Sequence, residues 1–400
     1  MDLTSGYPFW LIKDGLPFHY PKLNSNLETD VVILGGGISG SLAAYHLTEA
    51  NIKCIVLDSR SIGLGSTCAS TSLLQYEIDE PLIELTKKIG EDNARRAYSL
   101  CSQSIDKLEI IAKKIGLKDF EPKKSLYYAA KKGDVNFLKK EYEARKKAGF
   151  PVNYLASDEI NSGFNFKASG AILSDKGATT NAYQLTHFLH QYAIKKGLKV
   201  FDRTGASTVK HINNGLEIKT ENGFIIQAKK IIYATGYEVS EMLNKKIVNL
   251  NTTFACVSEQ FNDKSVFWKD EVLIWNTANP YLYTRTTNDN RLLVGGRDTK
   301  YNNPNLRSSQ LESKTKKLIS DFNKIFPSIP FKPEFCWAGT FGSTKDGLPY
   351  IGTNKKYPNS YFALGFGGNG ITFSLIAAEI ITDLIKGNSN SDAELFSFER

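Results

Sequence analysis

The chain has 400 residues, more than one hydrophobic core usually supports, so we expect two domains with a cleft between them. Hydrophobic residues make up 41% and charged residues 23%, which is typical of a globular protein and excludes a disordered or fibrous one. The net charge of +8 comes from lysine pairs spread along the chain, such as Lys113-Lys114 and Lys139-Lys140, which favours solvated helix faces over the alternative of a nucleic-acid surface.

The N-terminus, the most apolar stretch and the cysteines bear on the cellular location of the protein. The N-terminus lacks the cationic start and apolar centre of a signal peptide, and charged residues interrupt the most apolar stretch, 361–385, so we expect a cytoplasmic protein without a membrane segment. The five cysteines are scattered without metal-ligand spacing. They predict reduced thiols and no metal site.

A glycine-rich turn near the start of the chain carries the clearest signal. The apolar run DVVILGG predicts a buried parallel strand, ISGSLAAYHLTEAN after it has helical spacing, and a second strand, 54–57, ends at Asp58. In Gly35-x-Gly37-x-x-Gly40 the glycines allow a tight turn close to a pyrophosphate, and the helix N-terminus supplies amides. A carboxylate at Asp58 can accept hydrogen bonds from a ribose, so the unit predicts dinucleotide binding.

Arg60 leaves a second cofactor open. It lies two residues beyond Asp58 and could face the extra phosphate of NADP. Asp58 argues against that alternative, because an anion repels a phosphate.

The rest of the chain predicts helices, then alternating strands, then a return to the first pattern. Lysine-rich helices are expected within residues 80–148, and Asn181 should cap a further helix, followed by the strands LKVFD, LEIKT and IIQAKKIIYATG. Alternation in 281–285 and 291–295 predicts an antiparallel sheet. The end of the chain repeats the order strand, glycine turn and helix, and the helix should stop at Gly387.

This order predicts an α/β fold, with a discontinuous Rossmann-like domain that binds the dinucleotide and a second α+β substrate domain built on an antiparallel sheet. The cofactor-binding domain is expected to comprise residues 1–82, 170–246 and 336–400, and the substrate-binding domain residues 83–169 and 247–335.

Three segments favour FAD over NAD. Small and hydroxyl residues in 65–72 suit a pyrophosphate and a ring edge, although a plain loop is the alternative, and 231–237 ends a strand in small residues. The segment 365–372 opens the last helix, whose amides would face the N1 and C2 carbonyl region of a flavin, where negative charge gathers on reduction.

With these segments, the chain resembles the D-amino-acid oxidase-like (DAO) family of FAD-dependent oxidoreductases, which includes glycine oxidase, sarcosine oxidase and gamma-glutamylputrescine oxidase. The resemblance covers nearly the whole chain and rests on these runs: DVVILGGGISG from Asp30, LDSRSIGLGST from Leu57, IIYATGYE from Ile231, RLLVGGRD from Arg291, WAGTFGSTKDGLPYIG from Trp337 and ALGFGGNGIT from Ala363. It implies oxidation of the C–H bond of an amine or amino acid by hydride transfer to flavin N5, followed by hydrolysis of the imine.

The residues expected to contact the cofactor come from these segments. They are Gly35, Gly37, Ile38, Ser39, Gly40, Asp58, Ser59, Arg60, Gly65, Ser66, Thr67, Ser70, Leu73, Leu74, Val209, Ala234, Thr235, Gly236, Gly368, Asn369, Gly370, Ile371 and Thr372. Some relatives attach FAD to a cysteine or histidine, but neither Cys68 nor Cys336 lies in a matching motif. We expect FAD held without a covalent bond.

Two departures from the family leave substrate and oxidant open. Phe341 stands where glycine-oxidase-like members have an arginine that pairs with the substrate carboxylate. Leu293 stands where sarcosine-oxidase-like members have a lysine that activates oxygen, so the acceptor is oxygen or another, unknown compound.

Substrate contacts are expected from one face of a strand. Period-two alternation puts Tyr281, Tyr283 and Arg285 on that face, and Phe341 adds a fourth candidate. Arg285 either pairs with a substrate carboxylate or belongs to an exposed face. No catalytic base is predicted, and the histidines of the helices are expected to be packing residues.

The leading hypothesis is therefore an FAD-dependent oxidoreductase that oxidises a small amine or amino acid. Two alternatives stay open: oxidation of a modified nucleoside on tRNA, which the dispersed lysines disfavour, and a flavin-bearing subunit without turnover. Neither the substrate nor the oligomeric state follows from the sequence.

Overall fold

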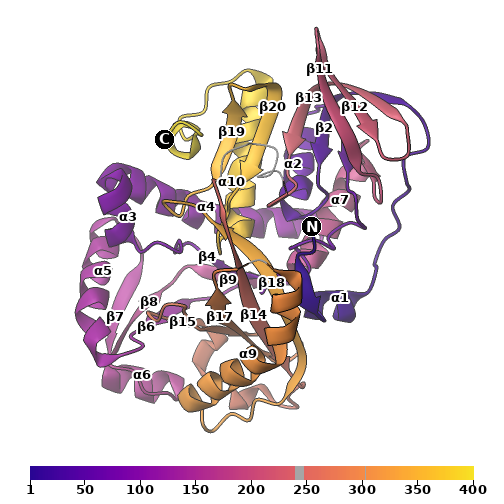
Figure 1. Ribbon diagram of the computed structural model, residues 1–400. Coiled ribbons are helices and arrows are strands. Elements are labelled where there is room, and N and C mark those ends of the chain that lie inside the picture. Colours follow the sequence, from indigo (N-terminus) through magenta and orange to yellow (C-terminus); the bar gives the residue numbers. More distant parts are fainter. Residues whose placement is uncertain (239–246, 302) are drawn as a thin grey trace.

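A computed structural model describes residues 1–238, 247–301 and 303–400 (Figure 1). Its strands form three sheets, one mainly parallel, one mainly antiparallel and one small. The α/β class predicted from the sequence is confirmed. Sheets and helices are drawn in Figure 1, with the mainly parallel sheet above the mainly antiparallel one.

The parallel sheet is built on the apolar runs that the sequence indicated. Its strands are β2 (Leu27–Leu34), β3 (Cys54–Leu57), β10 (Lys199–Phe201), β13 (Ile225–Tyr233) and β20 (Tyr357–Leu364), extended at the edges by β11 (Ala206–Ile212), β12 (Gly215–Thr220) and β19 (Tyr350–Asn354). One edge of β13 pairs with β2 along its whole length, and the other edge pairs first with β12 and then with β20. The C-terminal part of the chain thereby completes the sheet begun by the first strands.

Both faces of this sheet are covered, as the continuous apolar strands require. Helices α2 (Ile38–Glu49), α7 (Ala182–Ile194) and α10 (Gly370–Lys386) cover one face, with α2 packed between the other two. On the other face, apolar residues of β2 and β3 share a core with residues of the hairpin β11–β12.

The antiparallel sheet has nine strands in the order β1-β18-β14-β17-β16-β15-β6-β8-β7, of which only β15 and β6 are parallel neighbours. Their bounds are β1 (Thr4–Gly6), β6 (Ser125–Tyr128), β7 (Val152–Ala156), β8 (Gly170–Ser174), β14 (Asn249–Ser258), β15 (Leu273–Asn276), β16 (Tyr283–Thr286), β17 (Leu292–Thr299) and β18 (Pro333–Ser343). The small sheet consists of β4 (Leu73–Gln75), β9 (Gly177–Thr180) and β5 (Phe120–Pro122).

The remaining helices surround the antiparallel sheet or join it to the parallel one. They are α1 (Phe9–Asp14), α3 (Leu82–Ile89), α4 (Glu91–Ile115), α5 (Val135–Lys147), α6 (Ser157–Phe164) and α9 (Pro304–Ile325). Helix α9 packs on β14, β17 and β18, whereas the long helix α4 contacts α10 and α7.

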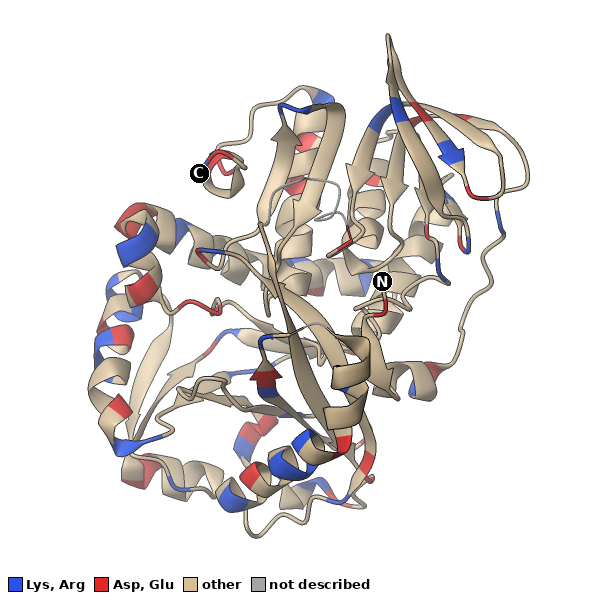
Figure 2. Ribbon diagram, viewed as in Figure 1, with Lys and Arg blue, Asp and Glu red and all other residues tan. Residues whose placement is uncertain are grey.

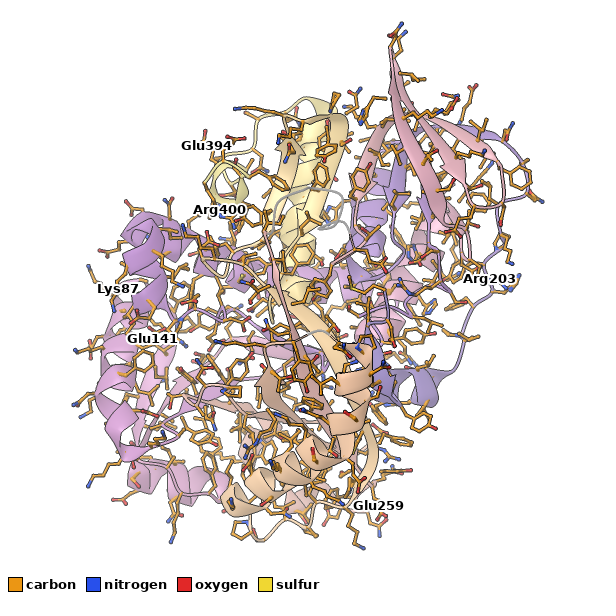
Figure 3. All side chains as sticks on the ribbon, in the orientation of Figure 1. Lys87, Glu141, Arg203, Glu259, Glu394 and Arg400 are labelled. Atoms are coloured by element: carbon orange, nitrogen blue, oxygen red, sulfur yellow. The ribbon has the colours of Figure 1, made fainter. Side chains whose placement is uncertain are left out.

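Helix ends follow the expected local chemistry. The Asn181 side chain accepts hydrogen bonds from the backbone N–H groups of Tyr183 and Gln184 at 3.1 and 3.0 Å, and Gly387 ends α10 in the left-handed conformation. Helix α3 has no capping side chain of its own. The buried carboxylate of Glu141, labelled in Figure 3, accepts from the N–H groups at its start instead.

Sheet membership bears on the predicted domain limits. Strands β1, β8 and β18 pair in the antiparallel sheet, although residues 1–82, 170–246 and 336–400 were predicted to form the FAD-binding domain. Helix α4, predicted in the substrate domain, packs on α10 as well as on α3. The limits themselves stay a prediction.

Charged residues are mixed over the outer helices α3, α5, α6 and α9, as Figure 2 shows. The lysine pairs seen in the sequence include ion-paired members, such as Lys124 with Asp175 at 2.7 Å and Lys147 with Glu91 at 2.7 Å. Within the described ranges, none of the helices is both long and apolar enough to cross a bilayer.

Candidate active site

A cavity of about 470 Å³ lies where the two large sheets meet. Most residues predicted to contact the cofactor line it: Gly35, Gly37, Ile38, Ser39, Asp58, Ser59, Arg60, Gly65, Ser66, Thr67, Ser70, Leu73, Leu74, Ala234, Thr235, Gly236, Gly368, Asn369, Gly370, Ile371 and Thr372. Of the four substrate candidates, Tyr281, Tyr283 and Phe341 line it as well. The structure therefore brings together six segments that are far apart in the sequence.

The glycine turn is shaped by close backbone contacts. A Cβ atom on Gly40 would lie 1.8 Å from the Gly35 carbonyl oxygen, so only glycine fits at the start of α2. Gly35 has a φ of +101°, and a Cβ there would lie 2.4 Å from the Ala234 oxygen. Gly40 packs against the backbone of Gly35 and does not itself line the cavity.

A buried histidine holds the same turn. His190 Nε2 lies 3.0 Å from the carbonyl oxygen of Gly36, which can only accept, so this nitrogen carries the proton. Burial lowers the pKa of His190 to about 4 and that of His46 to about 4, and burial with His190 nearby lowers the pKa of His187 to about 3. The low pKa values keep all three imidazoles neutral at pH 7. None of the three lines the cavity, so they are packing residues, as expected.

Asp58 ties the second strand to the turn. Its Oδ2 accepts from the Gly36 N–H at 2.7 Å and its Oδ1 from the Arg60 N–H at 2.8 Å. Burial raises the pKa of Asp58, and these two hydrogen bonds oppose the rise. The carboxylate faces the cavity with its remaining lone pairs, where a ribose hydroxyl could donate.

The guanidinium of Arg60 is already paired. It lies 2.5 Å from Glu238 Oε1, which also binds the amino group of Met1 at 2.9 Å. A cation shared in this way is a poor partner for an additional phosphate, which weakens the NADP alternative.

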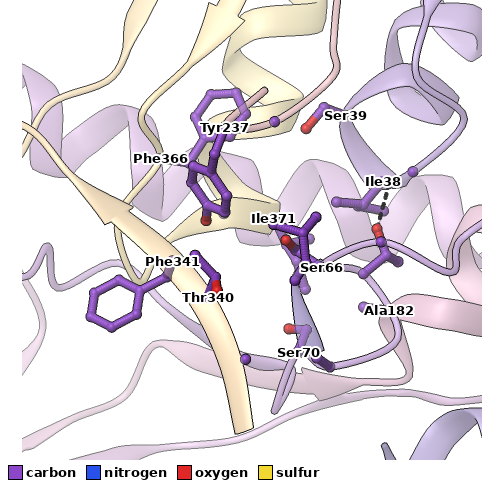
Figure 4. Close-up of a pocket in the computed structure, with 18 of the residues that line it drawn as sticks. Ile38, Ser39, Ser66, Ser70, Ala182, Tyr237, Thr340, Phe341, Phe366 and Ile371 are labelled. Carbon is purple, nitrogen blue, oxygen red and sulfur yellow. Dashed lines mark hydrogen bonds between the residues drawn. The ribbon is translucent and has the colours of Figure 1, made fainter. Parts of the chain in front are cut away.

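Two helices begin at the cavity. The first turn of a helix leaves amide groups unpaired and carries positive potential. At α2, Ile38 N–H donates to Thr67 Oγ1 at 3.1 Å, the dashed line in Figure 4, and Ser39 Oγ lies 2.8 Å from Ser374 Oγ of α10. The two helix N-termini are thus fastened to each other, an arrangement suited to a pyrophosphate and to the electron-rich edge of a flavin.

The turn before α10 is anchored on both sides. Asn369 Nδ2 donates to the carbonyl oxygens of Gln75 and Glu77 at 3.1 and 2.8 Å. Asp79 accepts from the Gly368 N–H at 2.7 Å and from the Tyr281 hydroxyl at 3.1 Å. A wall of the cavity from the antiparallel sheet is in this way joined to helix α10, which begins at the cavity.

Aromatic rings form that wall. Tyr281 and Tyr283 have ring centroids 5.8 Å apart, and burial raises the pKa of Tyr281 well above its ordinary value and that of Tyr283 to about 12, so both phenols are neutral. Thr340 and Phe341 leave β18 on opposite sides (Figure 4). No cationic side chain among the described lining residues stands beside these rings.

Two residues predicted to make contacts, Arg285 and Val209, do not line the cavity. Arg285 is only 1% exposed, and its guanidinium donates to the carbonyl oxygens of Ser72 and Thr180 at 2.7 and 3.0 Å, so it neither lines the cavity nor belongs to an exposed face. Val209 lies within β11 and does not line the cavity, whereas Ala206 at the start of the same strand does.

The sequence reasoning missed several lining residues. Gly205 and Ala206 follow strand β10, whose carboxyl end lies beside that of β3, and this neighbourhood was the available signal. Thr253 and Asp298 come from β14 and β17 of the antiparallel sheet. Asp298 is the charged residue at the end of the run RLLVGGRD, and a charge at the end of an apolar strand was the available signal.

The remaining predictions about thiols, oxygen and metals concern residues outside the cavity. Cys68 and Cys336 do not line it, which fits a non-covalent cofactor, and Leu293 is buried among Trp10, Trp337 and other apolar side chains. Over the described parts of the chain, no three His, Cys, Asp or Glu side chains are grouped to bind a metal.

These residues fit a dinucleotide whose reactive ring reaches the antiparallel sheet. The glycine cradle, two helix N-termini and a carboxylate at the end of β3 suit the adenosine and pyrophosphate, and the cavity continues to an aromatic wall. Such a combination defines a dinucleotide-dependent oxidoreductase.

Comparisons with known proteins name the family. Residues 30–384 match the family described as FAD dependent oxidoreductase (DAO), and the chain belongs to it. It is 24% identical over 387 residues to gamma-glutamylputrescine oxidoreductase of Escherichia coli (strain K12), covering 94% of this chain and 87% of that protein. It is 25% identical over 381 residues to glycine oxidase of Bacillus subtilis (strain 168), covering 92% and 96%.

Solved structures support the same fold. Glycine oxidase from Geobacillus kaustophilus superposes with a TM-score of 0.79 at 19% identity, covering 93% of this chain and 99% of that one. L-Amino acid deaminase from Proteus myxofaciens gives a TM-score of 0.79 at 15% identity and covers 96% of each chain. The chain is an FAD-dependent oxidoreductase, and FAD is its cofactor.

Proposed function

We propose that the protein oxidises the C–H bond next to the nitrogen of a small amine or amino acid. One observation carries the proposal: a single cavity runs from the glycine cradle of the cofactor to the aromatic wall formed by Tyr281, Tyr283 and Phe341. The substrates named for the relatives, a glutamylated diamine and glycine, point to the same class of reaction.

The residues of the chain have three tasks in this reaction. The turns at Gly35 and Gly368 would hold the cofactor between the two helix N-termini, and the hydroxyl of Tyr281, by its hydrogen bond to Asp79, fixes the wall against the second turn. The aromatic side chains exclude water from the substrate. When bound, FAD supplies the acceptor, at N5, for the hydride that leaves the substrate carbon, and the resulting imine hydrolyses.

The test separates the two half-reactions. The purified holoenzyme is mixed without oxygen with a panel of amines, N-methylated amines and amino acids, and the flavin absorbance is followed. Bleaching by an amine or amino acid is the expected result, and a panel that never bleaches the flavin would refute the proposal. Admission of air to the bleached enzyme then tells whether oxygen is the acceptor.

The tRNA alternative has less support. Its motivating feature, the charge of +8, is divided among lysines that include ion-paired members on several elements (Figure 2). A cytoplasmic location stays a prediction from the sequence.

A further inference from the structure

One carboxylate oxygen in the cavity has no hydrogen-bond partner among the described residues. Asp298 lies near the end of β17 and lines the cavity, and its Oδ1 is buried without a hydrogen bond to any of the described residues. A buried carboxylate oxygen left unpaired costs free energy, and native structures seldom keep one unless a ligand uses it.

The neighbours of Asp298 suit a cation better than an anion. The Thr253 hydroxyl lies beside it, and the neutral phenols of Tyr281 and Tyr283 stand close enough for the Asp298 charge to raise their pKa values. Aromatic faces and a carboxylate together attract an ammonium group.

The charge of the cavity points the same way. Among the described lining residues, Arg60 is the only cationic side chain, and it is paired with Glu238 at the other end of the cradle. Phe341 contributes no charge to the substrate wall. A substrate carboxylate would therefore meet Asp298 without a compensating cation.

We propose that Asp298 anchors an ammonium group of the substrate, so that the enzyme takes cationic amines without a carboxylate in preference to α-amino acids. This inference rests on the proposed function and names the substrate class of the same site. Binding satisfies the unpaired Oδ1 with a charge-assisted hydrogen bond, which is stronger than a neutral one.

The groups that face Asp298 set its titration. Burial and the neighbouring carboxylate of Asp79 raise its pKa, Thr253 and Lys314 of α9 lower it, and the net pKa is about 6. Asp298 is thus ionised above about pH 6. At pH 8 it carries its charge, and an alkylamine is still protonated.

Binding of an unreactive pair of probes tests the inference. The tert-butylammonium ion has no C–H bond next to nitrogen, and pivalate has the same shape with the opposite charge. Isothermal titration calorimetry of the holoenzyme at pH 8 should give an affinity for the ammonium at least about 10-fold above that for pivalate. Asp298→Asn should weaken ammonium binding about 10-fold or more, since the charge of the anchor is lost.

A matched control uses the carboxylate of Asp321, which pairs with Arg297 and does not line the cavity. Asp321→Asn should bind both probes as the wild type does. If Asp298→Asn does not fold, the wild type itself decides, because its affinity for the ammonium should fall as the pH is lowered from 8 to 5 and Asp298 becomes protonated.

Three results would overturn the inference: no ammonium binding, tighter binding of pivalate, or ammonium binding that neither Asp298→Asn nor acid weakens. Failure of the proposed function looks different. In that case the flavin is never bleached by the substrate panel, while ammonium binding still depends on Asp298.

Discussion

Replacing Asp298 by asparagine should stabilise the protein at neutral pH. Its pKa is about 6 in the fold against an ordinary value of 3.8. The folded state therefore holds the proton more tightly than the unfolded state does, and stability falls as the pH rises from 3.8 to 6. At 1.36 kcal/mol per pH unit, the penalty is about 3 kcal/mol at pH 8 and about half of that at pH 5.

Asparagine removes the charge and keeps the size of the side chain. The free energy of unfolding of the variant at pH 8 should therefore exceed that of the wild type by up to about 3 kcal/mol, less the cost of an unpaired amide. Urea unfolding at pH 8 and pH 5, with the same excess of FAD for each variant, measures the gain. The gain should shrink at pH 5. A variant less stable than the wild type at pH 8, or a gain independent of pH, would refute the reasoning. Asp321→Asn serves as the control for a carboxylate that is ion-paired and lies outside the cavity.

Three further results are expected. Gly40→Ala should abolish FAD retention in purified protein, because its Cβ would lie 1.8 Å from the Gly35 oxygen, and full retention would contradict the cradle described above. His190→Leu should weaken FAD binding by roughly 1–3 kcal/mol in equilibrium dialysis, since Gly36 loses a buried donor. In the wild type, the lowered pKa of about 4 at His190 predicts stability that is complete above pH 6.5 and lost as the pH falls toward 4, which acid titration of unfolding checks. Phe341→Arg should shift probe preference toward pivalate by about tenfold or more, and unchanged preference would exclude this position from the substrate wall.

The cofactor cradle could be predicted because each of its parts is local. The turn at Gly35, the carboxylate at Asp58 and the helix start at Gly370 depend on backbone geometry at the ends of elements whose apolar patterns are plain. Side-chain direction beyond a strand end is not local. Arg285 follows the predicted alternation, yet its environment is decided by the carbonyl groups of Ser72 and Thr180, which come from distant segments.

Asp298 is a residue of the cavity that the sequence did not indicate. Strand β17 continues past the predicted end at Gly295 to Thr299, and this extension carries the carboxylate to the cavity. Short strands such as β5 and β11 were also missed, because three to seven mostly polar residues give no clear alternation.

The hydrogen bond between Ser39 and Ser374 joins residues that are 335 positions apart. During synthesis the first half of the cradle leaves the ribosome long before strand β20 and helix α10 have been made. Until then, the part of β13 that pairs with β20 has no partner strand on that edge. FAD can find its full site only when almost all of the chain has emerged. A nascent chain that stalls late should therefore be colourless, and loss of the last helix should cost the cofactor even though every residue of the glycine turn is present.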